Sequence, residues 1–139
     1  MSKLQYAEAF QRLGAKLHNV QWSVCAVNVS GELIVSCWDH LFRQSHNGAI
    51  RYSDDLDRWG GPGNAELRRC LKHAFESKQT IRAVIAKADD TPSIDAGTDA
   101  SKLKKNFSVK EDWYGNVIEF DGRNVAIEFR RGHHSHGVP

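Results

Sequence analysis

The sequence predicts an α+β fold, with two helices packed on a mostly antiparallel, curved sheet or partly closed barrel of five to seven strands. Two segments carry apolar residues at helical spacing, one near the N-terminus and one in the middle of the chain. Short β-prone runs, joined by turns that contain glycine, make up most of the rest. Helices and strands are therefore segregated, and most neighbouring strands are expected to be antiparallel.

Length and composition indicate one domain. The chain has 139 residues, of which 40% are hydrophobic and 26% are charged, as in soluble globular proteins. We expect a single α+β domain over residues 1–130 and a flexible, histidine-containing tail over residues 131–139. The formal net charge of +2 permits a polyanionic partner without requiring one. No run approaches the roughly 18 apolar residues of a membrane helix, and no hydrophobic signal region opens the chain, so a cytoplasmic protein is expected.

The cysteines agree with that expectation. Cys25, Cys37 and Cys70 are odd in number and lack a CxxC spacing, so they form neither a disulfide framework nor a zinc ribbon. All three lie among apolar neighbours, and we expect buried, reduced thiols.

A helix and a hairpin are expected first. Residues 3–17 carry an apolar stripe at helical spacing, with Ser2 as the expected N-cap. Residues 20–29 and 33–38 are β-prone and flank the turn Ser30-Gly31, which predicts a hairpin. Because both faces of this hairpin are apolar, we expect it inside the sheet, covered on both sides, and not at an edge.

The second half of the chain predicts one helix and several strands. The helix begins at Gly63, and the very apolar run 80–88 is expected as an inner strand. Residues 89–105 break every pattern and predict a long mobile loop. Further strands are expected over residues 107–113, 116–120 and 124–129, with turns at 114–115 and 121–122 and a possible short strand at 49–52.

The run from Arg51 to Gly63 is the most informative segment for function. It combines two aromatic residues, two arginines and three aspartates, and it has no hydrophobic period, so no regular element is expected there. Tyr52 and Trp59 would stack on a base or frame a small ligand, while Arg51 and Arg58 hold a phosphate. In the structural alternative the rings fold back on the core and the aspartates pair with the arginines.

Basic residues form a second candidate surface. Arg68, Arg69 and Lys72 fall on the solvent side of the second helix, and Lys104 and Lys105 follow much later. If the fold gathers such residues, they would hold a nucleic-acid backbone without reading its sequence. The alternative is a solvated surface balanced by the 17 acidic residues.

Metal chemistry has weaker support. Glu119 and Asp121 share strand parity and would face one side, as the divalent ion of a nuclease requires, but no lysine follows at a convincing spacing. His133, His134 and His136 are packed closely enough to grip a transition metal, although a frayed tail is the more economical interpretation. Nucleophile elbows, phosphate-cradling loops and dinucleotide fingerprints are missing from the sequence, so we assign no catalytic residue, metal or cofactor.

Three function classes follow from these patterns. The first is a small non-catalytic binding module that acts on nucleic acid or on a nucleic-acid-handling complex. The residues expected to contact the ligand or supply charge are Arg51, Tyr52, Arg58, Trp59, Arg68, Arg69, Lys72, Lys104 and Lys105. The alternatives are a protein-binding adaptor or inhibitor, such as an anti-defence protein of a mobile element, and a metal-dependent nuclease. The expected partner is nucleic acid or a nucleic-acid-associated protein, with no membrane.

Overall fold

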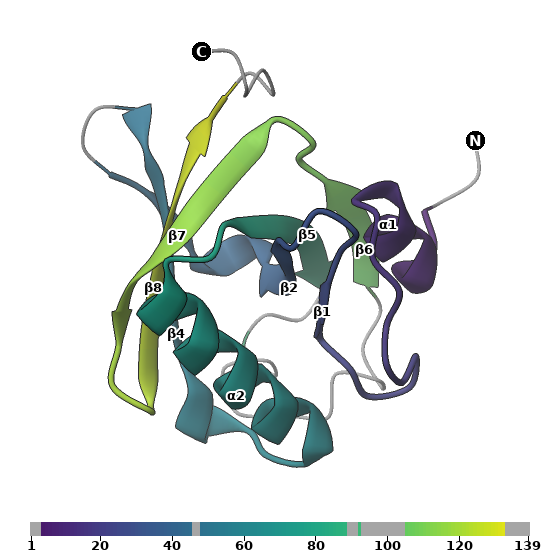
Figure 1. Ribbon diagram of the computed structural model, residues 1–139, viewed down its shortest axis with the longest axis horizontal. Helices are drawn as coiled ribbons and strands as arrows, with labels where there is room; N and C mark the ends of the chain where they lie inside the picture. Colours follow the sequence, from purple (N-terminus) through teal and green to yellow (C-terminus); the bar gives the residue numbers. More distant parts are fainter. Residues whose placement is uncertain (1–3, 46–47, 89–91, 93–104, 133–139) are drawn as a thin grey trace.

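The predicted α+β class is confirmed by the computed structural model, which describes residues 4–45, 48–88, 92 and 105–132. Within these residues two helices pack against one curved, mixed sheet that does not close into a barrel (Figure 1). The helices are α1 (Tyr6–Arg12) and α2 (Pro62–Ser77), and two short 3-10 turns are η1 (Asp39–Leu41) and η3 (Leu56–Arg58). The strands are β1 (Cys25–Val27), β2 (Leu33–Trp38), β3 (Phe42–Gln44), β4 (Ile50–Asp55), β5 (Ile81–Ala88), β6 (Lys105–Val109), β7 (Trp113–Phe120) and β8 (Asn124–Arg131).

The sheet is mostly antiparallel, as predicted. Its order is β1-β2-β5-β7-β8-β4-β3, and β6 also pairs with β5. Among the pairings of the described residues only β2 and β5 run parallel. The eight strands exceed the five to seven expected, because β3 was not predicted, while the possible short strand at 49–52 corresponds to the start of β4.

Two buried layers lie on opposite faces of the central strands. Ile34 of β2 and Val84 of β5 belong to the cluster that α1 covers. Their neighbours Val35 and Ile85 face the other way, into the larger cluster that α2 covers. Side chains of successive strand residues alternate between faces, so strands covered on both sides read as continuous apolar runs. Figure 1 shows α1 beside β6 and α2 against β7.

The N-terminal segments differ from the prediction in three ways. The first helix ends at Arg12, because Gly14 adopts a left-handed φ of 82°. The segment after it forms a turn at Asn19–Ser23, so β1 starts only at Cys25. The prediction that both hairpin strands lie inside the sheet is wrong for β1, which is an edge strand with Val27 53% exposed. Of the two hairpin strands, only β2 lies inside the sheet and has both faces covered. The pairing of β1 with β2 as a hairpin is confirmed.

The run after Arg51 is regular, contrary to the prediction. It continues β4 to Asp55, in register with β8, and then forms η3 before α2 begins at Pro62. Tyr52 points into the core while its neighbours point outward, as in a strand whose side chains alternate between two faces. The charged residues of this segment obscured that alternation in the sequence. The turn expected at residues 114–115 is also wrong: Gly115 lies inside β7, where a Cβ would come within 2.6 Å of Phe129 Cδ1.

Two predicted features fall largely outside the described residues. These are the loop at 89–105, of which Pro92 and Lys105 are described, and the tail at 131–139, of which Arg131 ends β8 and Gly132 follows. Neither α1 nor α2, the helices of the described segments, has the length and apolar character needed to cross a membrane.

Candidate ligand-binding cavity

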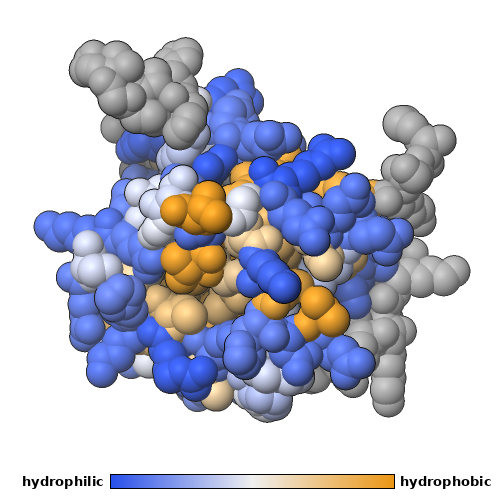
Figure 2. All heavy atoms as spheres, turned by 45° about the vertical axis from the view of Figure 1, so that its right-hand side comes forward, coloured by the Kyte–Doolittle hydropathy of each residue, from blue (hydrophilic) through white to orange (hydrophobic). Residues whose placement is uncertain are grey.

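A cavity of about 710 Å³ lies between α2 and the sheet. Leu67 and Leu71 of α2 form one wall, and Val35, Val125 and Ile127 of the strands form the opposite wall. Figure 2 shows apolar side chains in a recess on one face of the molecule, with hydrophilic side chains around it. A volume in the range of about 300–1,000 Å³ is typical of sites that enclose a small molecule.

Three of the four tryptophans line this cavity, each placed by a different local structure. Trp22 lies in the turn that Asn19 closes with its side chain, and the Tyr6 hydroxyl fixes that turn by donating to Ser23 O at 2.6 Å. Trp38 is the last residue of β2, and its N–H donates to the Tyr52 hydroxyl at 3.2 Å. The third ring, Trp59, follows η3.

The Trp59 segment is held in place by the start of α2. The Leu56 carbonyl accepts hydrogen bonds from Asn64 Nδ2 and from Arg68, both at 2.8 Å. These bonds fix η3 beside the helix, and Trp59 then crosses to α2 in extended backbone. Trp59 is half-buried, and its indole Nε1 is buried with no hydrogen-bond partner among the residues the structure describes. A buried donor without an acceptor costs about 1–3 kcal/mol.

A glycine lets the helix and the Trp22 turn meet. Any Cβ at Gly63 would collide with the Trp22 carbonyl oxygen, and Trp59 Cζ3 would lie 3.7 Å away. Gly63 is buried in the first turn of α2. The close approach of α2 to the backbone of the Trp22 turn therefore depends on the absence of a side chain here.

An ion pair supplies the main charge in the cavity wall. The Arg58 guanidinium donates two hydrogen bonds to the Asp54 carboxylate, at 2.9 and 2.8 Å, and the side chains are 14% and 8% exposed. Asp54 also accepts from the Asp55 N–H at 2.8 Å. Burial, together with the Asp54 charge, raises the pKa of Tyr52, so its hydroxyl stays protonated. The wall thus offers hydrogen-bonding groups with little net charge.

Four of the nine predicted site residues line this cavity. They are Tyr52, Arg58, Trp59 and Lys105, which come from β4, η3, the segment after η3 and the start of β6. Tyr52 is only 3% exposed, so the structural alternative, in which it belongs to the core, describes it better than a surface platform does. Trp59 packs against the core and also lines the cavity.

The other predicted residues do not gather there. Arg51 points away from the cavity and pairs with Glu119 at 2.8 Å. Arg69 and Lys72 are exposed on α2 and contribute nothing to the cavity wall. Lys104 lies outside the described residues.

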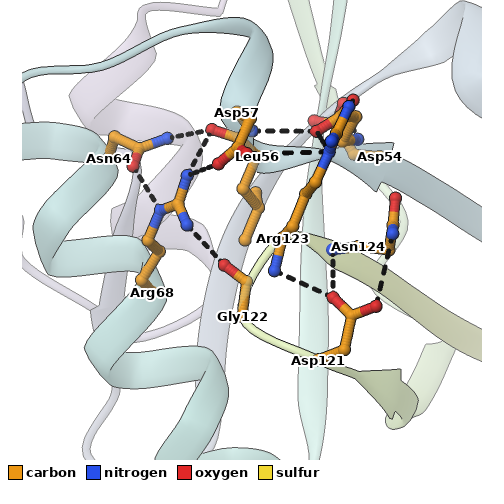
Figure 3. A network of polar contacts seen from close by, with 10 residues as sticks. Asp54, Leu56, Asp57, Asn64, Arg68, Asp121, Gly122, Arg123 and Asn124 are labelled. Atoms are coloured by element: carbon orange, nitrogen blue, oxygen red, sulfur yellow. Dashed lines mark hydrogen bonds and ion pairs between the residues drawn. The ribbon is translucent and has the colours of Figure 1, made fainter.

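Arg68 has a structural task, visible in Figure 3. Besides Leu56 O it contacts Asp57 Oδ1 at 2.7 Å, Asn64 Oδ1 at 2.6 Å and the Gly122 carbonyl. It therefore connects α2 to η3 and to the turn between β7 and β8.

Arg123, in the same turn, is also occupied. Its guanidinium binds Asp55 through two hydrogen bonds of 3.0 and 2.9 Å, and this pairing lowers the pKa of Asp55. Asp54, Asp55 and Asp57 are thus each paired with an arginine, as the structural alternative predicted, although only one of these arginines comes from the same run.

Several cavity residues were not singled out from the sequence. They are Tyr6, Trp22, Ser36, Trp38 and Phe107, whose pattern predicted only helix and strand cores. The one local signal was Asn19, whose side chain favours a turn over a strand just before Trp22.

The acidic residues considered for a nuclease centre lie on the protein surface. Glu119 pairs with Arg51, and the Asp121 carboxylate accepts from the backbone of Arg123 and Asn124. Across the described part of the chain, no group of three histidine, cysteine or acidic side chains is arranged to hold a metal ion.

Comparisons with protein-family models, with curated proteins and with solved structures found no match to this chain.

Proposed function

We propose that this protein is a non-catalytic nucleic-acid-binding module that takes one unpaired base into the cavity beside Trp59. The observation that carries the proposal is the buried Trp59 N–H, which lacks an acceptor in the described residues and belongs to a wall with two further indole rings.

The aromatic lining suits a flat ring. Trp22, Trp38 and Trp59 come from separate segments, and the about 710 Å³ between the walls leaves room for a base and its sugar. Stacking of a base on an aromatic side chain is worth about 1–3 kcal/mol and does not depend strongly on which base is present.

The polar groups suit the edge of a base. The Trp59 N–H can donate to a ring nitrogen or carbonyl oxygen of a base. The Ser36 hydroxyl, also in the cavity wall, can accept from an exocyclic amine. Recognition of splayed-out bases by stacking and edge hydrogen bonds is the usual way in which proteins read single strands.

Electrostatic attraction should contribute less to the affinity for nucleic acid than the basic residues of the sequence suggested. Arg58 and Lys105 are the cationic residues of the cavity wall, and Arg58 already pairs with Asp54, so Lys105 is the residue we test as a phosphate contact. Each neutralised phosphate of a single strand changes log K by about −0.7 per unit of log salt concentration. We therefore expect a salt slope near that of one contact, well below that of an extended basic surface.

The test is a titration of labelled single-stranded and duplex oligonucleotides, followed by fluorescence anisotropy. We expect the single strands to bind and the duplex to bind weakly, because a paired base cannot enter the cavity. Trp59→Phe keeps an aromatic ring and removes the N–H, so affinity should fall several-fold. Lys105→Ala should also weaken binding, whereas the matched Lys110→Ala, an exposed lysine outside the cavity wall, should not.

Two results would contradict the proposal. One is equal binding of duplex and single strands with unchanged affinity in Trp59→Phe. The other is no binding of any oligonucleotide at low salt while a protein partner co-purifies after nuclease treatment, which would establish the adaptor alternative.

A further inference from the structure

We propose that Cys25 and Cys70 form a reversible disulfide on exposure to hydrogen peroxide, joining β1 covalently to α2. This inference concerns a modification site and holds whatever the cavity binds.

The two cysteines meet where the helix packs on the edge strand. Cys25 of β1 is 1% exposed and belongs to the core cluster covered by α2. Cys70 is half-buried on α2 and packs against that same cluster. Both residues therefore pack in one cluster, and α2, which carries Cys70, contacts β1, which carries Cys25.

The third cysteine differs in position and provides an internal control. Cys37 of β2 is 0% exposed, and its S–H group donates to Val35 O at 3.6 Å within its own strand. It is buried too deeply for direct attack by an oxidant, and its pKa is raised by burial.

The surroundings of Cys25 and Cys70 shift the pKa values of the two thiols in opposite directions. The hydrogen bond from the Cys25 thiol lowers the pKa of Cys70 to about 7, helped by Arg69 and opposed by burial and by Glu66. The same hydrogen bond, together with burial, raises the pKa of Cys25. Cys70 is therefore the thiol that ionises more readily, and Cys25 is the thiol that keeps its proton.

The reaction has two balanced steps. The Cys70 thiolate attacks one oxygen of hydrogen peroxide, the O–O bond breaks, and hydroxide leaves a sulfenic acid on Cys70. The Cys25 sulfur then attacks the Cys70 sulfur, the S–O bond breaks, and the hydroxyl group departs as water with the Cys25 proton. Two thiols are oxidised to one disulfide, and one peroxide is reduced to two waters, since the first hydroxide takes the proton that Cys70 had lost.

The bond would form at the cavity wall. Val24 precedes Cys25, Leu71 follows Cys70, and both line the cavity. Oxidation therefore fixes α2 to β1 where the two elements enclose that space.

The experiment is peptide mapping after treatment of the intact protein with hydrogen peroxide and alkylation of the remaining thiols. Trypsin leaves Cys25 and Cys37 together on peptide 17–43 and Cys70 on peptide 70–72. We expect these peptides to be cross-linked, the protein to lose the mass of two hydrogen atoms, and a thiol reductant to reverse both changes. The cross-link should persist in Cys37→Ser and disappear in Cys25→Ser and Cys70→Ser.

Oxidised wild-type protein should also unfold at a higher urea concentration than the reduced form, because the cross-link constrains the unfolded chain. If Cys25→Ser does not fold, Cys37→Ser and Cys70→Ser still decide the outcome. A cross-link lost in Cys37→Ser would overturn the inference. So would sulfinic acid on Cys70 without any cross-link in the wild type, or no reaction with peroxide at all.

Discussion

Replacing Arg58 by methionine tests whether the ion pair in the cavity wall holds the site together. The change removes both hydrogen bonds to Asp54 and leaves a carboxylate whose side chain is 8% exposed. Removing one partner of a buried pair costs about 3–5 kcal/mol, because the remaining charge is uncompensated. We expect the low end of that range, about 3 kcal/mol, since Asp54 keeps its hydrogen bond from the Asp55 N–H.

The assay is urea unfolding of Arg58→Met, of Asp54→Asn and of the double variant. The double variant should recover most of the lost free energy of unfolding, because a neutral amide needs no counter-charge. Arg51→Met is the matched control: Arg51 and Glu119 are 37% and 62% exposed, and such a pair contributes about 0–1 kcal/mol. If Arg58→Met unfolds at the same urea concentration as Arg51→Met, the assignment of a buried, structurally essential pair is refuted.

Three further predictions concern the cavity wall and its surroundings. Leu71→Ala, at a position 1% exposed, should cost about 2–3 kcal/mol in urea unfolding, the lower part of the usual range because one side of this residue already faces the cavity. Gly63→Ala should lower both stability and oligonucleotide affinity by displacing Trp22, while Gly60→Ala, which has no atoms within 4 Å of the added Cβ, should change neither. The pKa of Asp55 is lowered from 3.8, so its contribution to stability is present above that pH and is lost as the pH falls through the lower folded-state value. In Asp55→Asn, the loss of folded protein with falling pH below about pH 4 should therefore be less steep than in the wild type, as measured by circular dichroism against pH. The same pH dependence of unfolding in both proteins would contradict the assignment.

The fold was predictable where local pattern and burial agree. Residues 81–88 form a strand covered on both faces, which favours the largely apolar run seen in the sequence, although Arg82 and Lys87 interrupt it. The spacing of Leu67, Leu71 and Ala74 defines the buried face of α2. Gly31, with a φ of 80°, allows the tight turn that sets the register of β1 and β2.

The cavity was less predictable because it depends on contacts between distant segments. Trp59 was recognised, but its position is set by Asn64 and Arg68, which hold the preceding turn from α2. Trp22 was assigned to a strand, since its β propensity outweighs the single turn signal of Asn19. A cavity forms where the side chains of two distant segments leave space between them. The sequence pattern of either segment alone does not indicate that space.

The arginines illustrate the same limit. Arg68 was expected in solvent, because its helical position lies outside the apolar stripe. The structure gives it hydrogen bonds to two carbonyl groups and two side chains from other parts of the chain or the preceding helical turn. Charge alone therefore could not distinguish a ligand-binding arginine from one that joins elements.

The central claim is that the Trp59 N–H contacts the edge of an unpaired base. The most direct measurement is a two-dimensional NMR spectrum of the indole N–H signals while a short single-stranded oligonucleotide is added. The chain has four tryptophans, and Trp113 serves as the internal control, because it packs against Phe42 and Phe129 outside the cavity wall. We predict a downfield shift of the Trp59 signal that saturates with binding, while the Trp113 signal stays in place. A saturating complex in which the Trp59 signal does not move would contradict the account.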